Sequence, residues 1–203
     1  MLHSATFMIV LRERPSSMSE PSIVGLIPSG KITSSLLDVL AAHILGLLYL
    51  PVDILPPFDP PPGTYHTGRN QYHVGYLLEF LAAQQNSCRK VLGVASYDLF
   101  LPIFTHVYGE AQMSGKAAIF SIHRLEHISP SIEPEKRSTS PHETFFLRAA
   151  KVGIHELLHT FGLSHCRHPD CLMGFVTRLE NLDALPLYLC HSCRQFWEEV
   201  RDM

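Results

Sequence analysis

Two histidines and a glutamate in the last quarter of the chain have the types and spacing needed for metal chemistry. His155 and His159 are four residues apart in an H-E-x-x-H pattern, and Glu156 follows the first of them. On a helix, residues four apart project from one face about one turn above each other, so both imidazoles can reach one metal ion. Glu156 can then reach a water on that ion without being a ligand itself.

The pattern continues with a glycine and a third histidine. Gly162 follows His159 by three residues, and His165 follows Gly162 by three. A glycine there can adopt a left-handed conformation, end the helix and turn the chain back toward the metal. Three histidine ligands leave the fourth tetrahedral position for water, which is typical of a catalytic zinc site. A bare H-E-x-x-H occurs by accident in many helices, but the longer spacing is specific.

This site predicts hydrolysis of peptide bonds in a peptide or protein substrate. Zinc lowers the pKa of a bound water to about 7, and Glu156 would take the proton of that water as general base. The hydroxide would attack an amide carbonyl polarised by zinc, and Glu156 would return the proton to the leaving amine. The alternative is a catalytically silent, zinc-stabilised protein that binds peptide. Glu156 argues against it, because a binder needs no carboxylate beside the metal.

Four cysteines form a second cluster directly after the third histidine. They are Cys166, Cys171, Cys190 and Cys193, the last two in a C-x-x-C pair. Two pairs of cysteines joined by a linker of 18 residues suit a tetrahedral zinc site with four thiolate ligands. Four thiolates close the coordination shell, so this zinc would be structural and would hold His165 and Met173 in place. We therefore predict two Zn²⁺ per chain, one catalytic and one structural.

Two other interpretations of the cysteines fit the sequence less well. Disulfides require an oxidising compartment, and the chain carries no export signal that would indicate one. A zinc ribbon that binds nucleic acid conflicts with the charge, because 16 Lys and Arg against 19 Asp and Glu give a net charge of −3. We expect no nucleic-acid partner, and we expect the fifth cysteine, Cys88, to be a small buried hydrophobe.

The composition is that of a folded globular protein. The chain has 203 residues, of which 46% are hydrophobic and 17% charged, enough for one domain with a full core. We expect residues 21–203 to form a single domain, and residues 1–20 to be an extension that is disordered or mis-started, with the true start at Met18. No apolar run is long enough to span a membrane, so we expect a cytoplasmic protein with no membrane partner. The oligomeric state is left open.

Strand-like and helix-like segments alternate along the chain. Strands are expected at 22–27, 52–55, 91–96, 104–108 and 117–122, helices from residue 34 and over 70–84 and 143–161, and loops at 56–63, 109–115 and 129–142. Thr33 or Ser34 can cap the first helix. This order predicts an α+β or α/β domain with a mixed sheet.

Taken together, the motifs resemble the archaemetzincin family of zinc metallopeptidases. The resemblance is carried by the pattern from His155 to Cys193 and extends more loosely to Arg69-x-Gln71-Tyr72 and Gly109-Glu110-Ala111. It implies a compact metzincin-like α+β domain with a twisted mixed sheet, flanking helices, an active-site helix, a Met-turn and a C-terminal four-cysteine zinc site. Some family members have aminopeptidase-type activity.

The resemblance also implies a role for each matching residue. By position, His155, His159 and His165 bind the catalytic zinc, Glu156 is the general base, Met173 forms the Met-turn, and Cys166, Cys171, Cys190 and Cys193 bind the structural zinc. The five residues after Met173, 174–178, differ from the Ser- and Asn-rich turn expected there. This departure concerns substrate specificity rather than metal binding.

Overall fold

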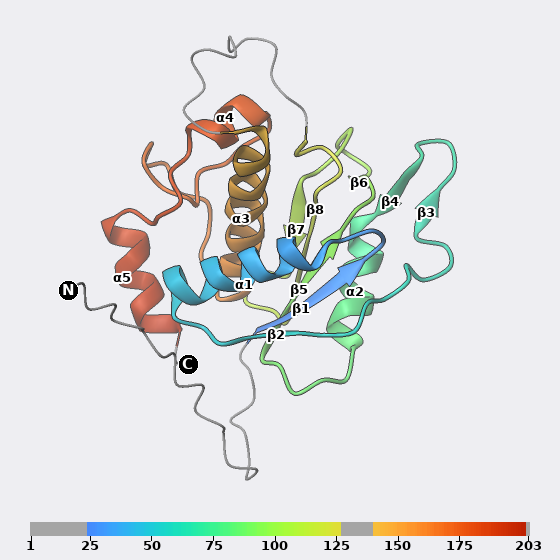
Figure 1. Ribbon diagram of the computed structural model, residues 1–203, viewed down its shortest axis with the longest axis horizontal. Coiled ribbons are helices and arrows are strands. Elements are labelled where there is room, and N and C mark those ends of the chain that lie inside the picture. The colour runs from blue at the N-terminus through green and yellow to red at the C-terminus, as the bar shows by residue number, and fades with distance from the viewer. Residues whose placement is uncertain (1–23, 127–139, 202–203) are drawn as a thin grey trace, which may run out of the picture.

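The computed structural model describes residues 24–126 and 140–201, and Figure 1 shows their arrangement. The strands are β1 (Val24–Ser29), β2 (Val52–Ile54), β3 (Tyr65–His66), β4 (Gln71–His73), β5 (Lys90–Ala95), β6 (Leu99–Phe100), β7 (Gly109–Ala111) and β8 (Ala117–Ser121). The helices are α1 (Ser34–Leu48), α2 (Val74–Ala83), α3 (Pro141–Thr160), α4 (Leu179–Ala184) and α5 (His191–Val200). Within the described ranges, no helix has the length and apolar character needed to cross a membrane.

A five-stranded mixed sheet forms the centre of the molecule. Its strand order is β2-β1-β5-β8-β7, and β3, β4 and β6 form a separate three-stranded sheet. Strands β2, β1, β5 and β8 are parallel, whereas β7 runs antiparallel to β8 and forms an edge. Parallel neighbours need long crossover connections, which helices supply. The mixed sheet with flanking helices confirms the predicted fold class.

Side chains alternate between the two faces of this sheet, as the pleat requires. On one face, Leu26 and Phe120 belong to a core shared with α1, α3 and α5. On the other face, Ile27 and Ile119 pack with the buried residues of α2. Both faces are therefore covered, and α3 is held against the sheet along one of them. Cys88 is buried, as predicted.

Helix α3 carries the H-E-x-x-H pattern and is well defined at its start. The Ser140 hydroxyl accepts a hydrogen bond from the Glu143 N–H, and the Glu143 carboxylate accepts one from the Ser140 N–H, which makes a capping box. Pro141 occupies the first turn, where its missing N–H costs nothing. The helix begins two residues before the predicted start, and its second half is almost wholly buried.

The predicted strand at 104–108 is wrong. This segment is irregular apart from an isolated bridge between Leu99 and Val107, and the strand lies instead at Gly109–Ala111, where a loop was predicted. The physical reason is that side chains of Arg69 and Gln71 bind the carbonyl groups of this segment. The carbonyls of Phe104 and Thr105 thus bind side chains in place of the N–H groups of a neighbouring strand.

The predicted helix at 70–84 begins later than expected, at Val74. Residues Gln71–His73 pair with β3 and β6 as strand β4, so they are not free to form the first helical turn. The proposed extension 1–20 lies outside the described residues, as does most of the polar loop 129–142.

Candidate active site and metal clusters

The three histidines of the sequence pattern lie together at the C-terminal end of α3. One ring nitrogen from each of His155, His159 and His165 lies within 4.8 Å of the other two. The ring centroids are 4.7 Å apart for His155 and His159, 5.2 Å for His155 and His165, and 4.9 Å for His159 and His165. The structure therefore brings together all three residues that the spacing singled out.

Gly162 makes the turn that returns the third histidine to the helix. Helix α3 ends at Thr160, and Gly162 has a φ of 94°, in the left-handed region that favours glycine. Its N–H donates to the carbonyl of His159, and the N–H of Leu163 donates to the carbonyl of Leu158. These bonds satisfy carbonyls at the helix end. The chain then reverses, as predicted, and places His165 beside the other two rings.

Backbone carbonyls orient two of the imidazoles. Nδ1 of His155 lies 2.9 Å from the carbonyl oxygen of Leu172, and Nδ1 of His159 is hydrogen-bonded to that of Leu163. A carbonyl can only accept, so both Nδ1 atoms carry the proton and both Nε2 atoms keep a lone pair. The two Nε2 atoms are 3.1 Å apart. Two lone pairs this close repel unless a cation lies between them.

The histidines are also in the neutral form that a metal requires. Burial, with the proximity of His159, lowers the pKa of His155 to about 3. Burial likewise lowers the pKa of His159 and of His165. A ligand must be deprotonated to bind, so these shifts prepare the nitrogens for metal at neutral pH. Three neutral imidazole nitrogens fit zinc, although this ligand type also suits copper, iron and nickel.

Glu156 lies beside the histidines on α3 and is almost completely buried, with 9% of its surface exposed. Burial, with a smaller effect of the nearby Glu110 carboxyl, raises the pKa of Glu156 well above its ordinary value. Burial also raises the pKa of Glu110. Both carboxyls therefore lie in surroundings that favour their neutral form.

Glu156 and the histidines line a cleft of about 280 Å³. Its walls are α3, the segment 104–110 and the segment 172–177, with further contacts from Leu182 and Leu185. Phe104 and Phe175 line it while remaining 45% and 64% exposed, and the Phe175 ring centroid lies 5.0 Å from that of His165. The residues after Met173, which departed from the family pattern, therefore face the space that a substrate would occupy.

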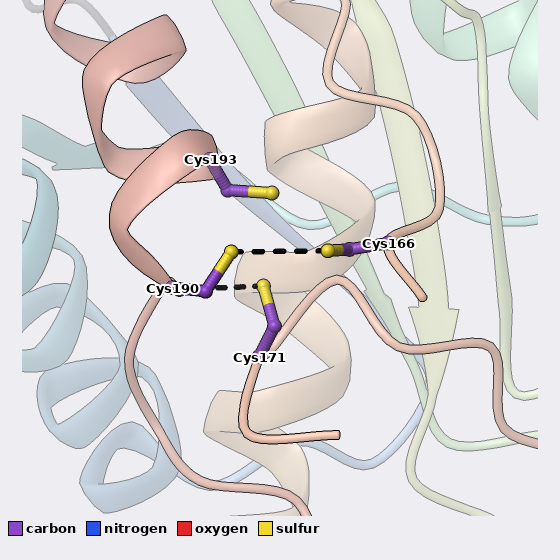
Figure 2. A group of neighbouring side chains, drawn as sticks. All are labelled: Cys166, Cys171, Cys190 and Cys193. Carbon is purple, nitrogen blue, oxygen red and sulfur yellow. Dashed lines mark hydrogen bonds between the residues drawn. The ribbon is translucent and has the colours of Figure 1, made fainter. Parts of the chain in front are cut away.

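The four cysteines form a second convergent cluster (Figure 2). Their sulfurs all lie within 4.8 Å of one another, two from the loop after α3 and two from the start of α5. All four are free thiols, and the sulfurs of Cys166 and Cys190 are 3.8 Å apart, far beyond the ~2.05 Å of a disulfide. The N–H of Cys190 donates to Sγ of Cys171. Four sulfurs around one point fit a tetrahedral zinc ion.

One short segment connects the two clusters. The N–H of Cys166 donates to the carbonyl of Met173 at 2.8 Å, and Met173 is fully buried. The carbonyl of Leu172 orients His155, while the N–H of Leu172 donates to the carbonyl of Tyr188 at 2.8 Å. Cys171 directly precedes Leu172 in this segment. A metal ion held by the four cysteine sulfurs would therefore also fix the Leu172 carbonyl, which orients His155.

The wall of the cleft opposite α3 was not identified by sequence reasoning. It consists of the segment 104–108 and strand β7, neither of which was expected to lie beside Glu156. Gly109-Glu110-Ala111 appeared only among the looser matches to the family. The sequence indicated this wall only weakly, because the position of β7 beside the site depends on its pairing with β8 and not on a local sequence pattern.

Comparison with known proteins decides the family. Residues 34–199 match Peptidase family M54, which is most of the chain. The chain belongs to peptidase family M54. The archaemetzincin of Natronomonas pharaonis is 34% identical over 135 residues, covering 66% of this chain and 76% of that protein. The archaemetzincin of Haloquadratum walsbyi is 29% identical over 173 residues, covering 85% and 98%.

Solved structures of archaemetzincins show the same fold. The crystal structure of archaemetzincin from Methanopyrus kandleri matches with a TM-score of 0.77 at 28% identity, covering 90% of this chain and 97% of that one. The archaemetzincin from Archaeoglobus fulgidus, crystallised with malonate, matches with a TM-score of 0.71 at 26% identity, covering 85% and 99%. The resemblance to archaemetzincins is thus confirmed, and the chain is a zinc metallopeptidase.

Proposed function

We propose that this metallopeptidase hydrolyses peptide bonds with His155, His159 and His165 as the ligands of a catalytic zinc and Glu156 as the general base. The observation that carries the proposal is the pair of Nε2 lone pairs facing each other 3.1 Å apart. They lie beside a buried carboxyl, in a cleft open to a peptide. No other described cluster of three or more possible ligands contains histidine.

Each residue has a separate task in this reaction. A zinc ion in the site would lower the pKa of a bound water to about 7 and polarise the peptide carbonyl. Glu156, buried in the cleft beside the three histidines, accepts the proton of the attacking water and delivers it to the leaving amine. The carbonyls of Leu172 and Leu163 keep two imidazoles in one orientation and one tautomer throughout.

We further propose that Cys166, Cys171, Cys190 and Cys193 hold a second, structural zinc, giving two Zn²⁺ per chain. The convergence of four free sulfurs supports this, together with the N–H groups of Cys190 and His168 that donate to two of them. Four thiolates leave no open position for water. Free thiols persist in reducing compartments, so we propose that the enzyme works in the cytoplasm.

A peptide library analysed by mass spectrometry tests the proposed function. Wild type is compared with His159→Ala, which loses a ligand, and with His43→Ala on α1 as a matched control. We expect products from wild type and the control only. Loss of single residues from the amino end would establish the aminopeptidase-type activity that the family resemblance implies, and internal cuts would establish an endopeptidase. Wild type that carries zinc and binds peptides without products would instead be a peptide-binding protein.

A further inference from the structure

The side chain of Glu156 packs against the edge strand β7. Gly109, the first residue of β7, pairs with Phe120 on β8, so both residues face the same side of the sheet. Phe120 belongs to the core shared with α3, and a side chain at position 109 would therefore also point toward α3. Glu156 on α3 occupies the position toward which a side chain at residue 109 would point.

The fit between the two residues leaves no room for a side chain on Gly109. A Cβ atom added there would lie 2.6 Å from Cγ of Glu156, and 2.9 Å from both its Cδ and its Oε1. Non-bonded carbon atoms prefer separations of about 3.5–4.0 Å. All three of the nearest atoms belong to the catalytic carboxyl side chain, so a substitution at position 109 acts on Glu156 first.

We propose that Gly109 is a positioning residue, whose missing side chain determines where the Glu156 carboxyl lies relative to the three histidines. The inference rests on the proposed role of Glu156 as general base. Glu156 is a long side chain that can rotate about its bonds, whereas the β7 backbone is fixed by its pairing with β8. A methyl group at position 109 therefore displaces the carboxyl and leaves the fold and the histidines in place.

Other glycines show that this contact is particular to Gly109. A Cβ atom on Gly93 would meet Leu81 and Ile119, which are core side chains, so that glycine serves packing. A Cβ atom on Gly46, in the exposed face of α1, would meet nothing within 4 Å. Gly46→Ala is therefore a matched control, since it makes the same chemical change without touching the site.

The kinetic test compares Gly109→Ala with Gly46→Ala and wild type. Displacing a catalytic group by about 1 Å can cost on the order of 100-fold in rate, so we expect kcat of Gly109→Ala to fall by about that factor. We expect its KM, its zinc content and its melting temperature to stay close to those of wild type, and Gly46→Ala to keep full kcat. A Gly109→Ala enzyme with wild-type kcat would overturn the inference and leave the proposed function intact.

A structural test does not depend on activity. Crystal structures of wild type and Gly109→Ala should show the Glu156 carboxyl displaced and the three imidazoles unmoved. An unmoved carboxyl with a shifted β7 would overturn the inference. If Gly109→Ala fails to fold, the double variant Gly109→Ala, Glu156→Ala should fold again, because the colliding atoms are gone; failure of the double variant would equally contradict the proposed contact.

Discussion

Asp98 shows how a single buried carboxylate is kept ionised in this protein. Its side chain is 8% exposed and accepts hydrogen bonds from Nε and Nη2 of Arg124 at 2.8 and 2.6 Å, and from Nε2 of Gln71 at 2.8 Å. Burial raises the pKa of Asp98, but the bonds from Arg124 and Gln71 outweigh burial and bring the pKa below its ordinary value. The folded state therefore stabilises the charged form.

The lowered pKa of Asp98 makes the free energy of unfolding depend on pH, and the direction of the shift sets the sign of that dependence. A carboxyl with a lowered folded-state pKa contributes stability above its unfolded pKa of about 3.9, and loses it as pH falls through the folded value. We expect Asp98→Asn to lower the free energy of unfolding by ~2 kcal/mol at pH 7. The difference from wild type should shrink below about pH 4. Urea titrations at both pH values measure this, and a difference independent of pH would contradict it.

The convergence of the three histidines could be predicted because their relation in the sequence is local. The four-residue spacing of His155 and His159 fixes one helix face, and Gly162 signals the turn that returns His165. The partners of Asp98 could not be predicted, since Arg124 lies 26 residues away with no spacing rule to connect them. Gly109 was equally hidden, because its contact with Glu156 depends on how a strand pairs.

Side chains in and next to the three-stranded sheet hold one wall of the cleft in place. Nη2 of Arg69, between β3 and β4, donates to the carbonyls of Phe104 and Thr105 at 2.6 and 3.1 Å, and Nε donates to Gln71 at 2.9 Å. The guanidinium also lies over the ring of Phe100, 4.4 Å from its centroid. The segment 104–105 is thus fixed in place without forming a strand.

Arg69→Lys tests this support of the cleft wall. Lysine keeps the charge but lacks the planar fork that binds several acceptors at once. We expect KM for a cleaved peptide to rise roughly tenfold, about the effect of losing one charge-assisted hydrogen bond. Zinc content should stay unchanged. The exposed Lys31→Ala variant serves as control, and an unchanged KM in Arg69→Lys would show that the wall does not depend on Arg69.

Local patterns predicted the strands β1, β2, β5 and β8 and the helices α1, α2 and α3. The short strands β3, β4, β6 and β7 and the helices α4 and α5 were not predicted. The apolar spacing of α1 and the buried runs of β1, β5 and β8 lie in the sequence itself. The predicted strand at 104–108 and the predicted helical turn at 70–73 are wrong for the same kind of reason. In each segment, contacts with residues distant in the sequence outweigh the local preference. The start of α3 could have been predicted two residues earlier, because the S-x-x-E spacing of Ser140 and Glu143 is a local pattern typical of a capping box.

For the whole molecule, the C-terminal segment is part of the core that supports the active site. Trp197 on α5 packs edge-on against Phe161 at the end of α3, with ring centroids 5.0 Å apart. Trp197 is 3% exposed. The cysteine cluster joins the start of α5 to the loop after α3 (Figure 2). If the four cysteines hold the proposed zinc, its loss would therefore loosen α5 and the segment that carries Met173.

A pair of cysteine variants tests whether the cysteine cluster binds zinc and stabilises the fold. Cys193→Ala removes one sulfur of the cluster, whereas Cys88→Ala removes a buried thiol outside it. We expect Cys193→Ala to lose one of two zinc ions and to melt on the order of 10 °C lower, because a ligand bound only to the folded state stabilises by several kcal/mol. Cys88→Ala should keep both ions. Equal zinc content in the two variants would contradict the proposed role of Cys193 as a zinc ligand.

The Glu156→Gln variant tests whether Glu156 is the general base. Glu156→Gln keeps the size of the side chain but cannot accept a proton, and Glu79→Gln, exposed on α2, is the matched control. With two zinc ions per chain verified in the same samples, we predict that kcat of Glu156→Gln falls by roughly 10²–10⁴-fold on a peptide that wild type cleaves. Glu79→Gln should match wild type. A zinc-loaded Glu156→Gln enzyme with wild-type kcat would show that Glu156 is not the general base.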